Sequence, residues 1–287
     1  MSHRSRRAAG AAAIRILLAV AFFLAVAVAF GFMVFPVVAI FFHVTPARLF
    51  HELGTPIVTH ALIISGQTTV ESMFLILLFG TPTAWFLASR RFRGRTLLVT
   101  LAELPIVLPP AVAGIGLLLA FGRSTFLFHH LGQIGINPYF NTTAVDFAIM
   151  LVAGPFYVRQ AIASFEAVDG NLIAASRTLG AGPLRTFFKV TVPLARGGLA
   201  AGFAICMARG LGEFGATIMF AGSLQGKSET LPVAIYTEFE GNFDVAVAIS
   251  ALLIAISLAI LLMLKVSVLW QPSRQTSLSP FARFGSS

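Results

Sequence analysis

The stretch NLIAASRTLGAGPLRTFFKVTVPLA, residues 171–195, interrupts an otherwise strongly apolar sequence. Asn171 is of a type that caps helix N-termini, and apolar residues recur after it at helical spacing. Gly180 is typical of a helix end, and Pro183 suits the first turn of a new helix. The stretch is also too polar to cross a bilayer. It therefore predicts two short helices, joined by a sharp turn, on a membrane surface.

The second of these helices carries two different faces. Arg185 and Lys189 are four residues apart and share one face. The other face is apolar and carries Leu184, Phe187 and Phe188. Such a helix can rest on lipid headgroups, or it can dock into a groove of a cytosolic partner. The residues alone leave both interpretations open.

The composition around this stretch is that of an integral membrane protein. Hydrophobic residues make up 57% of the chain and charged residues only 11%, with a mean hydropathy of +0.89. A soluble domain has roughly 25% charged residues. The net charge of +9 would suggest nucleic acid for a soluble protein. Here the basic residues fit a membrane surface instead, so we expect lipid and no nucleic acid as a partner.

Six apolar runs are long enough to cross a bilayer as helices, since a spanning helix needs about 20 residues. They are residues 16–42, 70–87, 97–121, 145–163, 194–220 and 245–270. The first run is too long for a signal peptide, whose apolar region has about 7–15 residues. We therefore expect an all-α protein with a segment 1–15, a six-helix domain 16–270 and a tail 271–287.

The lysines and arginines predict the orientation of these six helices. They gather in residues 4–15, 90–95, 159–196 and 265–283, which lie on one side of the membrane if all six runs span it. The opposite side receives Arg48, Arg123 and Lys227. Because basic residues mark the cytoplasmic side, both termini and the stretch 171–195, between the fourth and fifth helices, are expected in the cytoplasm.

Helix breakers and charges inside the runs have two interpretations each. Pro109 and Pro110 lie in the third run, where they either kink a helix that lines a pathway or serve ordinary packing. Arg209 and Glu213 are four residues apart in the fifth run and can pair. Charges at membrane depth usually face a bundle interior or a cavity. This pair is therefore either a pathway or gate position or a structural ion pair.

The stretch 171–195 resembles the cytoplasmic "EAA" loop of ABC importer permeases. That motif is Glu-Ala-Ala, three residues, Gly, nine residues, then Ile-x-Leu-Pro; Gly180 and Pro193 have its spacing. Ala174 stands where the motif has its acidic residue. The resemblance implies that this loop forms a coupling helix that contacts the ATPase subunit. The residues assigned to that contact are Ala174, Ala175, Ser176, Arg177, Thr178, Leu179, Gly180, Ala181, Gly182, Pro183, Leu184 and Arg185.

The resemblance extends over about residues 66–265 and points to the molybdate type of permease. It is carried by three stretches: TPTAWFLASRRFRGRTLLVTLAELPIVLPPAVAGIGLLLAFG, residues 165–222, and ETLPVAIYTEFEGNFDVAVAISALLIAISLAILLML. It implies a multi-pass protein of the cell (inner) membrane that forms the translocation pathway for molybdate. Sulfate and tungstate permeases are close relatives and remain alternatives.

The resemblance also implies partners. These are a second copy of the chain in a homodimer, cytosolic ABC ATPase subunits that use ATP and Mg, and an extracytoplasmic oxyanion-binding protein. The chain has no GxxxxGK[ST] motif, so we expect no ATP site and no bound cofactor of its own. Its histidine spacings match no standard metal pattern and no nucleophile–base set can be built, so we expect no metal site and no enzymatic activity. From the residues alone, a secondary transporter whose loop rests on lipid is the alternative from a different class.

Overall fold

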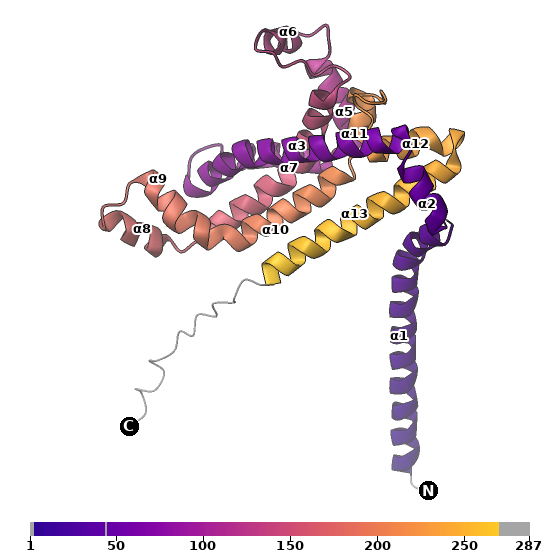
Figure 1. The fold of residues 1–287 in the computed structure, drawn as a ribbon. Coiled ribbons are helices and arrows are strands. Elements are labelled where there is room, and N and C mark those ends of the chain that lie inside the picture. The colour runs from indigo at the N-terminus through magenta and orange to yellow at the C-terminus, as the bar shows by residue number, and fades with distance from the viewer. Residues whose placement is uncertain (1–2, 44, 270–287) are drawn as a thin grey trace, which may run out of the picture.

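The computed structural model describes residues 3–43 and 45–269, and within them all regular structure is helical (Figure 1). The elements are α1 (His3–His43), α2 (Pro46–Leu53), α3 (Pro56–Ser89), α4 (Arg95–Val107), α5 (Pro110–Phe121), α6 (Phe126–Gln133), α7 (Thr142–Glu166), α8 (Gly170–Thr178), α9 (Pro183–Thr186), the π-helix η1 (Phe187–Thr191), α10 (Val192–Leu211), α11 (Gly215–Phe220), α12 (Leu231–Gly241) and α13 (Phe243–Leu269). The predicted all-α class is confirmed. The tail 271–287 lies outside the described residues.

Five helices in the described part are long and apolar enough to span a membrane: Ile14–His43, Pro56–Ser89, Thr142–Glu166, Pro183–Leu211 and Phe243–Met263. The predicted third span is not one straight helix. It is divided into α4 and α5, which meet at an angle of 115°. A sixth span exists only if this bent pair is counted as one. The boundaries also differ, since α3 begins well before residue 70.

The bend between α4 and α5 has a local cause in two consecutive prolines. Leu108 precedes Pro109 and has an extended backbone, with φ −71° and ψ 135°. The ring of a proline disfavours the helical conformation in the residue before it. Pro109 and Pro110 also lack the N–H groups that a continuous helix would use. Pro110 is then well suited to begin α5.

Three long helices, α3, α7 and α10, form the centre of the bundle, with α7 in contact with both of the others. Small residues allow this close packing. A Cβ on Gly202 in α10 would lie 2.9 Å from the Cβ of Gln160 in α7, and a Cβ on Gly198 would clash with the Ser164 side chain. Buried Tyr157 adds a hydroxyl contact of 2.6 Å to Thr81 in α3.

The helix α1 stands apart from this bundle and contacts α13 (Figure 1). Its side chains from residue 14 to residue 38 are all exposed, although they are almost all apolar. In a membrane such a surface is covered by lipid or by another protein. The helix therefore contributes little to the core of a single chain.

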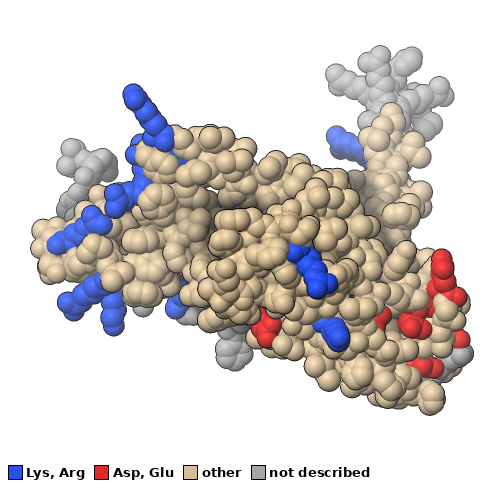
Figure 2. All heavy atoms as spheres, turned by 90° about the horizontal axis from the view of Figure 1, so that it is seen from above, with Lys and Arg blue, Asp and Glu red and all other residues tan. Residues whose placement is uncertain are grey.

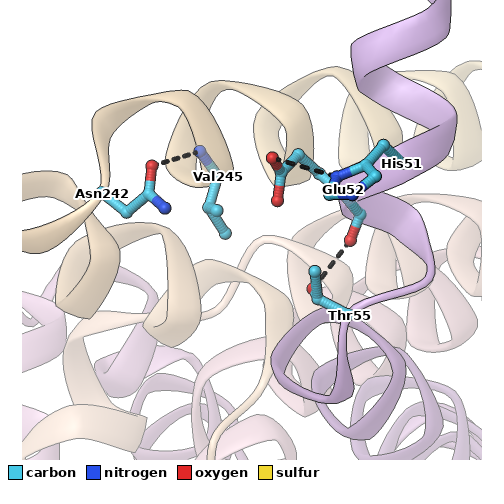
Figure 3. A network of polar contacts seen from close by, with 5 residues as sticks. All are labelled: His51, Glu52, Thr55, Asn242 and Val245. Carbon is cyan, nitrogen blue, oxygen red and sulfur yellow. Dashed lines mark hydrogen bonds and ion pairs between the residues drawn. The ribbon is translucent and has the colours of Figure 1, made fainter.

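A corner formed by α2 and the start of α3 lies against the first turn of α13 (Figure 3). The Thr55 hydroxyl donates to the Glu52 carbonyl oxygen at 2.7 Å, and His51 Nδ1 lies 3.6 Å from Glu52 Oε1. Asn242 Oδ1 accepts a hydrogen bond from the Val245 N–H at 3.4 Å. These local contacts fix the turns that join the long helices.

Charges are divided between the two ends of the bundle (Figure 2). Lysine and arginine side chains gather at the end that carries α8 and α9, and acidic side chains gather at the end that carries α12. The predicted asymmetry of basic residues along the sequence is therefore also an asymmetry in space.

Candidate functional site

The turn within residues 174–185 is a Schellman motif, in which a left-handed glycine ends a helix. Gly180 has φ +83°, its N–H donates to the Arg177 carbonyl oxygen at 2.9 Å, and the Ala181 N–H donates to the Ser176 carbonyl oxygen at 3.1 Å. These two bonds satisfy carbonyl groups at the end of α8. The predicted helix end at Gly180 is confirmed, and it fixes the direction in which the chain leaves α8.

The N-terminus of α8 differs from the prediction, because Asp169 and not Asn171 is the N-cap. The Asp169 carboxylate accepts from the Asn171 N–H at 2.9 Å. Both residue types cap helices well, and the helix begins at Gly170, so Asn171 already lies inside it. The sequence pattern did not distinguish two capping residues this close together.

The prediction of a separate second short helix is wrong. Pro183 begins a helix that continues through α9, η1 and α10 to Leu211. The π turn makes this continuity possible: the Val192 N–H donates to the Phe187 carbonyl oxygen five residues back. A proline inside a helix removes a backbone donor, and the wider π turn just before Pro193 accommodates that loss.

The apolar residues of this region do not share one face. Phe187 is buried, with its ring 4.7 Å from Trp85 and 6.0 Å from Phe165 between centroids. Leu184 and Phe188 are exposed, and Leu179 at the turn is 89% exposed. The Ser176 and Thr186 hydroxyls, 3.1 Å apart, join α8 to α9. The segment 174–185 thus contacts the rest of the bundle on one side and has exposed leucine side chains on the other.

A groove of about 580 Å³ lies beside this segment, between α8 and the start of the long helix. It is lined by apolar side chains from both walls, including Leu172 of α8 and Leu179 just after it, and by Arg185 and Lys189 of the long helix. A second hollow of about 1070 Å³ lies beside the same helices, against the ends of α3 and α7. Both hollows are lined by residues of α8, which lies at the basic end of the bundle (Figure 2).

The structure brings the predicted prolines close to the predicted ion pair, at the far end of the long helix that begins at Pro183. The chain breaks a second time at Gly212, and α11 begins at Gly215. A Cβ on Gly215 would lie 2.8 Å from the Cβ of Pro110. Likewise, a Cβ on Gly114 would lie 2.7 Å from the Ala216 carbonyl oxygen. The breaks in two spans therefore pack directly against each other.

Arg209 and Glu213 form the ion pair that their spacing allows, with Nη1 2.8 Å from Oε2. The Glu213 side chain is only 1% exposed, and its Oε1 accepts from the Ala216 N–H at 2.8 Å. The Glu213 carboxylate therefore forms an ion pair with Arg209 and also accepts a hydrogen bond from the first turn of α11. A buried carboxylate without these partners would be very costly.

The structure also contains polar contacts that the sequence did not indicate. Asp146, 6% exposed in α7, accepts from the Ser72 hydroxyl of α3 at 3.0 Å. Arg95 pairs with Glu166, and Arg159 Nε lies 3.5 Å from Glu103 Oε1. The partners are far apart along the chain, so local spacing carries no signal for them. Only the presence of polar residues in apolar runs could have drawn attention to Asp146.

Comparison with known proteins identifies the kind of protein to which this geometry belongs. Residues 80–271 match the family described as "Binding-protein-dependent transport system inner membrane component". The "Molybdenum transport system permease protein ModB" of Mycobacterium tuberculosis is 40% identical over 233 residues, which cover 80% of this chain and 88% of that protein. The "Probable transport system permease protein NifC" of Clostridium pasteurianum is 33% identical over 253 residues, 88% of each chain.

A solved structure supports the same fold. It is a bacterial alginate ABC transporter in complex with an alginate pentasaccharide-bound periplasmic protein. One of its chains matches with a TM-score of 0.66 and 18% identity, over 87% of this chain and 93% of that chain. At this level of identity the likeness concerns the arrangement of helices alone.

Proposed function

Because the chain belongs to the family of binding-protein-dependent transport system inner membrane components, we propose that it forms the pathway by which an ABC importer carries molybdate into the cell. The chain is an ABC importer permease subunit and a multi-pass inner-membrane protein. The choice of molybdate is supported by the identity of 40% to a molybdenum permease over most of the chain. Sulfate and tungstate, two other tetrahedral dianions, are the alternatives that an experiment must separate.

The orientation that we propose has α8 and both termini in the cytoplasm. The support is the gathering of lysines and arginines at the α8 end of the bundle and of acidic residues at the α12 end (Figure 2). Basic residues are retained on the cytoplasmic side of bacterial inner membranes. The end that carries α12 then faces the periplasm, where an oxyanion-binding protein would deliver the substrate.

The observation that carries the coupling mechanism is the exposed, fixed segment 174–185. Its turn is held by the two backbone hydrogen bonds that Gly180 and Ala181 donate, and Leu179 is 89% exposed beside it. An exposed apolar helix end flanked by Arg177 and Arg185 suits a groove on a cytosolic partner. We assign this contact to ATPase subunits, which would bind and hydrolyse ATP with Mg. This chain would bind neither ATP nor Mg.

The path from this contact to the membrane interior is continuous. The hydroxyl contact between Ser176 and Thr186 joins α8 to the helix that runs from Pro183 to Leu211. At its far end lie the Arg209–Glu213 pair and the break that packs on Pro110. We propose that a movement of α8 is transmitted along this helix and opens or closes the pathway where the two breaks meet.

A homodimer is the proposed assembly, with two ATPase subunits on the cytoplasmic side. The exposed apolar surface of α1 is of the kind that a second protein or lipid covers. The pathway would then lie between the two copies.

The function can be tested by uptake into liposomes. The chain is reconstituted with its ATPase subunits and binding protein, and labelled molybdate uptake is measured with ATP and with a non-hydrolysable analogue. We expect uptake only with ATP, and competition by unlabelled molybdate at lower concentration than by sulfate. Stronger competition by sulfate would overturn the assignment of molybdate but keep the importer.

A separate arm tests the class of transporter. The chain is reconstituted without ATPase subunits, and uptake is driven by a pH gradient or a membrane potential. We expect none. Substantial uptake in this arm would indicate a secondary transporter and would overturn the coupling mechanism.

A further inference from the structure

The larger hollow at the basic end of the bundle lies between α8 and the ends of α3 and α7. Its volume is about 1070 Å³, and four arginines and one glutamate are the charged residues that line it. The proposed coupling mechanism uses the opposite side of α8, where the leucines are exposed. The hollow shares Arg177 and Pro183 with the segment 174–185, but the function proposed above assigns no ligand to the hollow itself.

One of the four arginines already has a carboxylate partner. Arg95 Nε donates to the Leu87 carbonyl oxygen at 2.6 Å, and its guanidinium contacts the Glu166 carboxylate. Arg95 therefore joins the end of α3 to the start of α4, and it neutralises Glu166, the single acidic residue that lines the hollow. The charge of this pair contributes little to the attraction of a ligand.

The other three arginines remain uncompensated. Arg90, Arg91 and Arg177 form no hydrogen bond or ion pair with any described residue, and all three are exposed. Arg90 and Arg91 follow α3, whereas Arg177 is in the last turn of α8 on the other side of the hollow. Arginines from two elements thus line one space, and a guanidinium group is suited to planar, bidentate contact with a phosphate.

The inner wall of the hollow is aromatic and carries hydroxyls. The rings of Trp85 and Phe187 lie 4.7 Å apart, and Phe165 packs on the same Phe187. Buried Thr186 and Thr191 also line the space. A ligand that fits has an anionic group for the arginines and an apolar part for the rings. The volume is also far larger than a single phosphate requires.

We propose that this hollow binds a phosphate group, carried by an anionic phospholipid whose glycerol and first acyl carbons lie on Trp85 and Phe187. Basic pockets at the cytoplasmic ends of spanning helices hold anionic headgroups in this way. Tryptophan at such a depth marks the membrane interface. Inorganic phosphate is the other source of the same chemistry. A bound headgroup would join the end of α3 to α8 and stiffen α8 before any partner docks.

The test measures binding to the full-length chain and not transport, so its failure is separate from a failure of the proposed function. Native mass spectrometry counts retained lipid, and a thermal melt records stabilisation. The probes are phosphatidylglycerol, phosphatidylcholine and inorganic phosphate. The variant is R90Q with R177Q. The matched control is R93Q with R196Q, which removes the same charge from exposed residues outside the hollow.

We expect phosphatidylglycerol to bind the unaltered chain and the control, and to bind the R90Q/R177Q variant at least tenfold more weakly, from about 1 kcal/mol per arginine. Phosphatidylcholine should bind weakly to the unaltered chain, to the control and to the R90Q/R177Q variant.

Inorganic phosphate tests the other source of the ligand. If it stabilises the unaltered chain and this stabilisation is lost in the R90Q/R177Q variant, the site binds a soluble phosphate. Equal loss in the control, or equal binding of both lipids, would overturn the proposal. Equal melting midpoints without ligand verify that the variant is folded.

Discussion

Pro110 and Gly215 lie in direct contact at the first turns of α5 and α11, so close that a Cβ on Gly215 would be 2.8 Å from the Cβ of Pro110. Each residue follows a break in its own span. The two breaks therefore support each other, and neither helix can shift at this point without moving the other.

The contact predicts a stability difference between two neighbouring glycines. Gly215→Ala should destabilise the protein by about 1–3 kcal/mol, because an added methyl must displace the Pro110 ring. Gly212→Ala is the control, since its added Cβ would meet only the Ala208 carbonyl oxygen at 4.0 Å. Thermal melts in detergent measure both. Equal melting midpoints for the two variants would contradict the close contact.

The ion pair of Arg209 and Glu213 allows a double-mutant cycle. Arg209→Met leaves a carboxylate that is 1% exposed without its cation and should cost about 3 kcal/mol of stability. Adding Glu213→Gln should restore most of that loss, since glutamine can still accept from the Ala216 N–H. A melt of the double variant no higher than that of Arg209→Met would contradict the pairing.

Transport by the same double variant separates the two interpretations of the pair. If the pair only joins helices, uptake should recover together with stability. If Arg209 also meets the anion in the pathway, uptake should remain low although stability recovers. We expect the second result, because Arg209 is 29% exposed at a place where two spans are broken.

The turn at Gly180 should determine the coupling of ATP hydrolysis to uptake. Gly180→Ala puts a side chain at φ +83°, at a cost of about 1 kcal/mol, although nothing lies within 4 Å of the added Cβ. We expect less uptake per ATP hydrolysed, with the spans still folded. Gly170→Ala is the matched control, since it also has empty space around it but an ordinary φ. Equal ratios in both variants would argue against the segment 174–185 as the contact.

A pH dependence of stability is expected from the loop before α12. Burial raises the pKa of the Glu229 carboxyl, which is 6% exposed, above its ordinary value, and the hydrogen bond from the Thr237 hydroxyl at 2.9 Å opposes this in part. The folded state therefore binds the proton more tightly than the unfolded state does. Stability should fall as the pH rises from about 4.3, the ordinary value for glutamate, through the raised pKa.

Thermal melts between acidic and neutral pH check this expectation. Glu229→Gln should flatten the decline and raise the melting midpoint at neutral pH. Glu240→Gln, which changes an exposed acid in the neighbouring helix, should leave the decline as it is. If the stability of Glu229→Gln falls with rising pH as much as that of the unaltered chain, another titrating group causes the fall.

The sequence predicted those features that depend on neighbours along the chain. Long apolar runs indicated the spans, a glycine followed by a proline indicated the turn at Gly180, and a spacing of four indicated the Arg209–Glu213 pair. Each of these signals is local, because a helix brings residues three and four apart together. The "EAA" spacing then supplied the family, which the comparisons confirm.

Features that depend on tertiary contacts could not be predicted in this way. Two prolines signal a break, but the 115° angle at Pro109 depends on the packing of α5 against α11. The pairing of Ser72 with Asp146 joins residues 74 positions apart. The continuity through Pro193 was missed because a proline ordinarily ends a helix, and no sequence rule indicates the π turn that accommodates it.

That continuity has a mechanical consequence. From Pro183 to Leu211 the helix has 29 residues, a rod of about 44 Å at 1.5 Å per residue. Phe187 packs against Trp85 and Phe165 near one end of the helix, so the rod has a fulcrum with a short arm toward Pro183 and a long arm toward Arg209. A small stroke at Pro183 would become a larger sideways swing at Arg209. The π turn beside the fulcrum is where such a lever would flex under load.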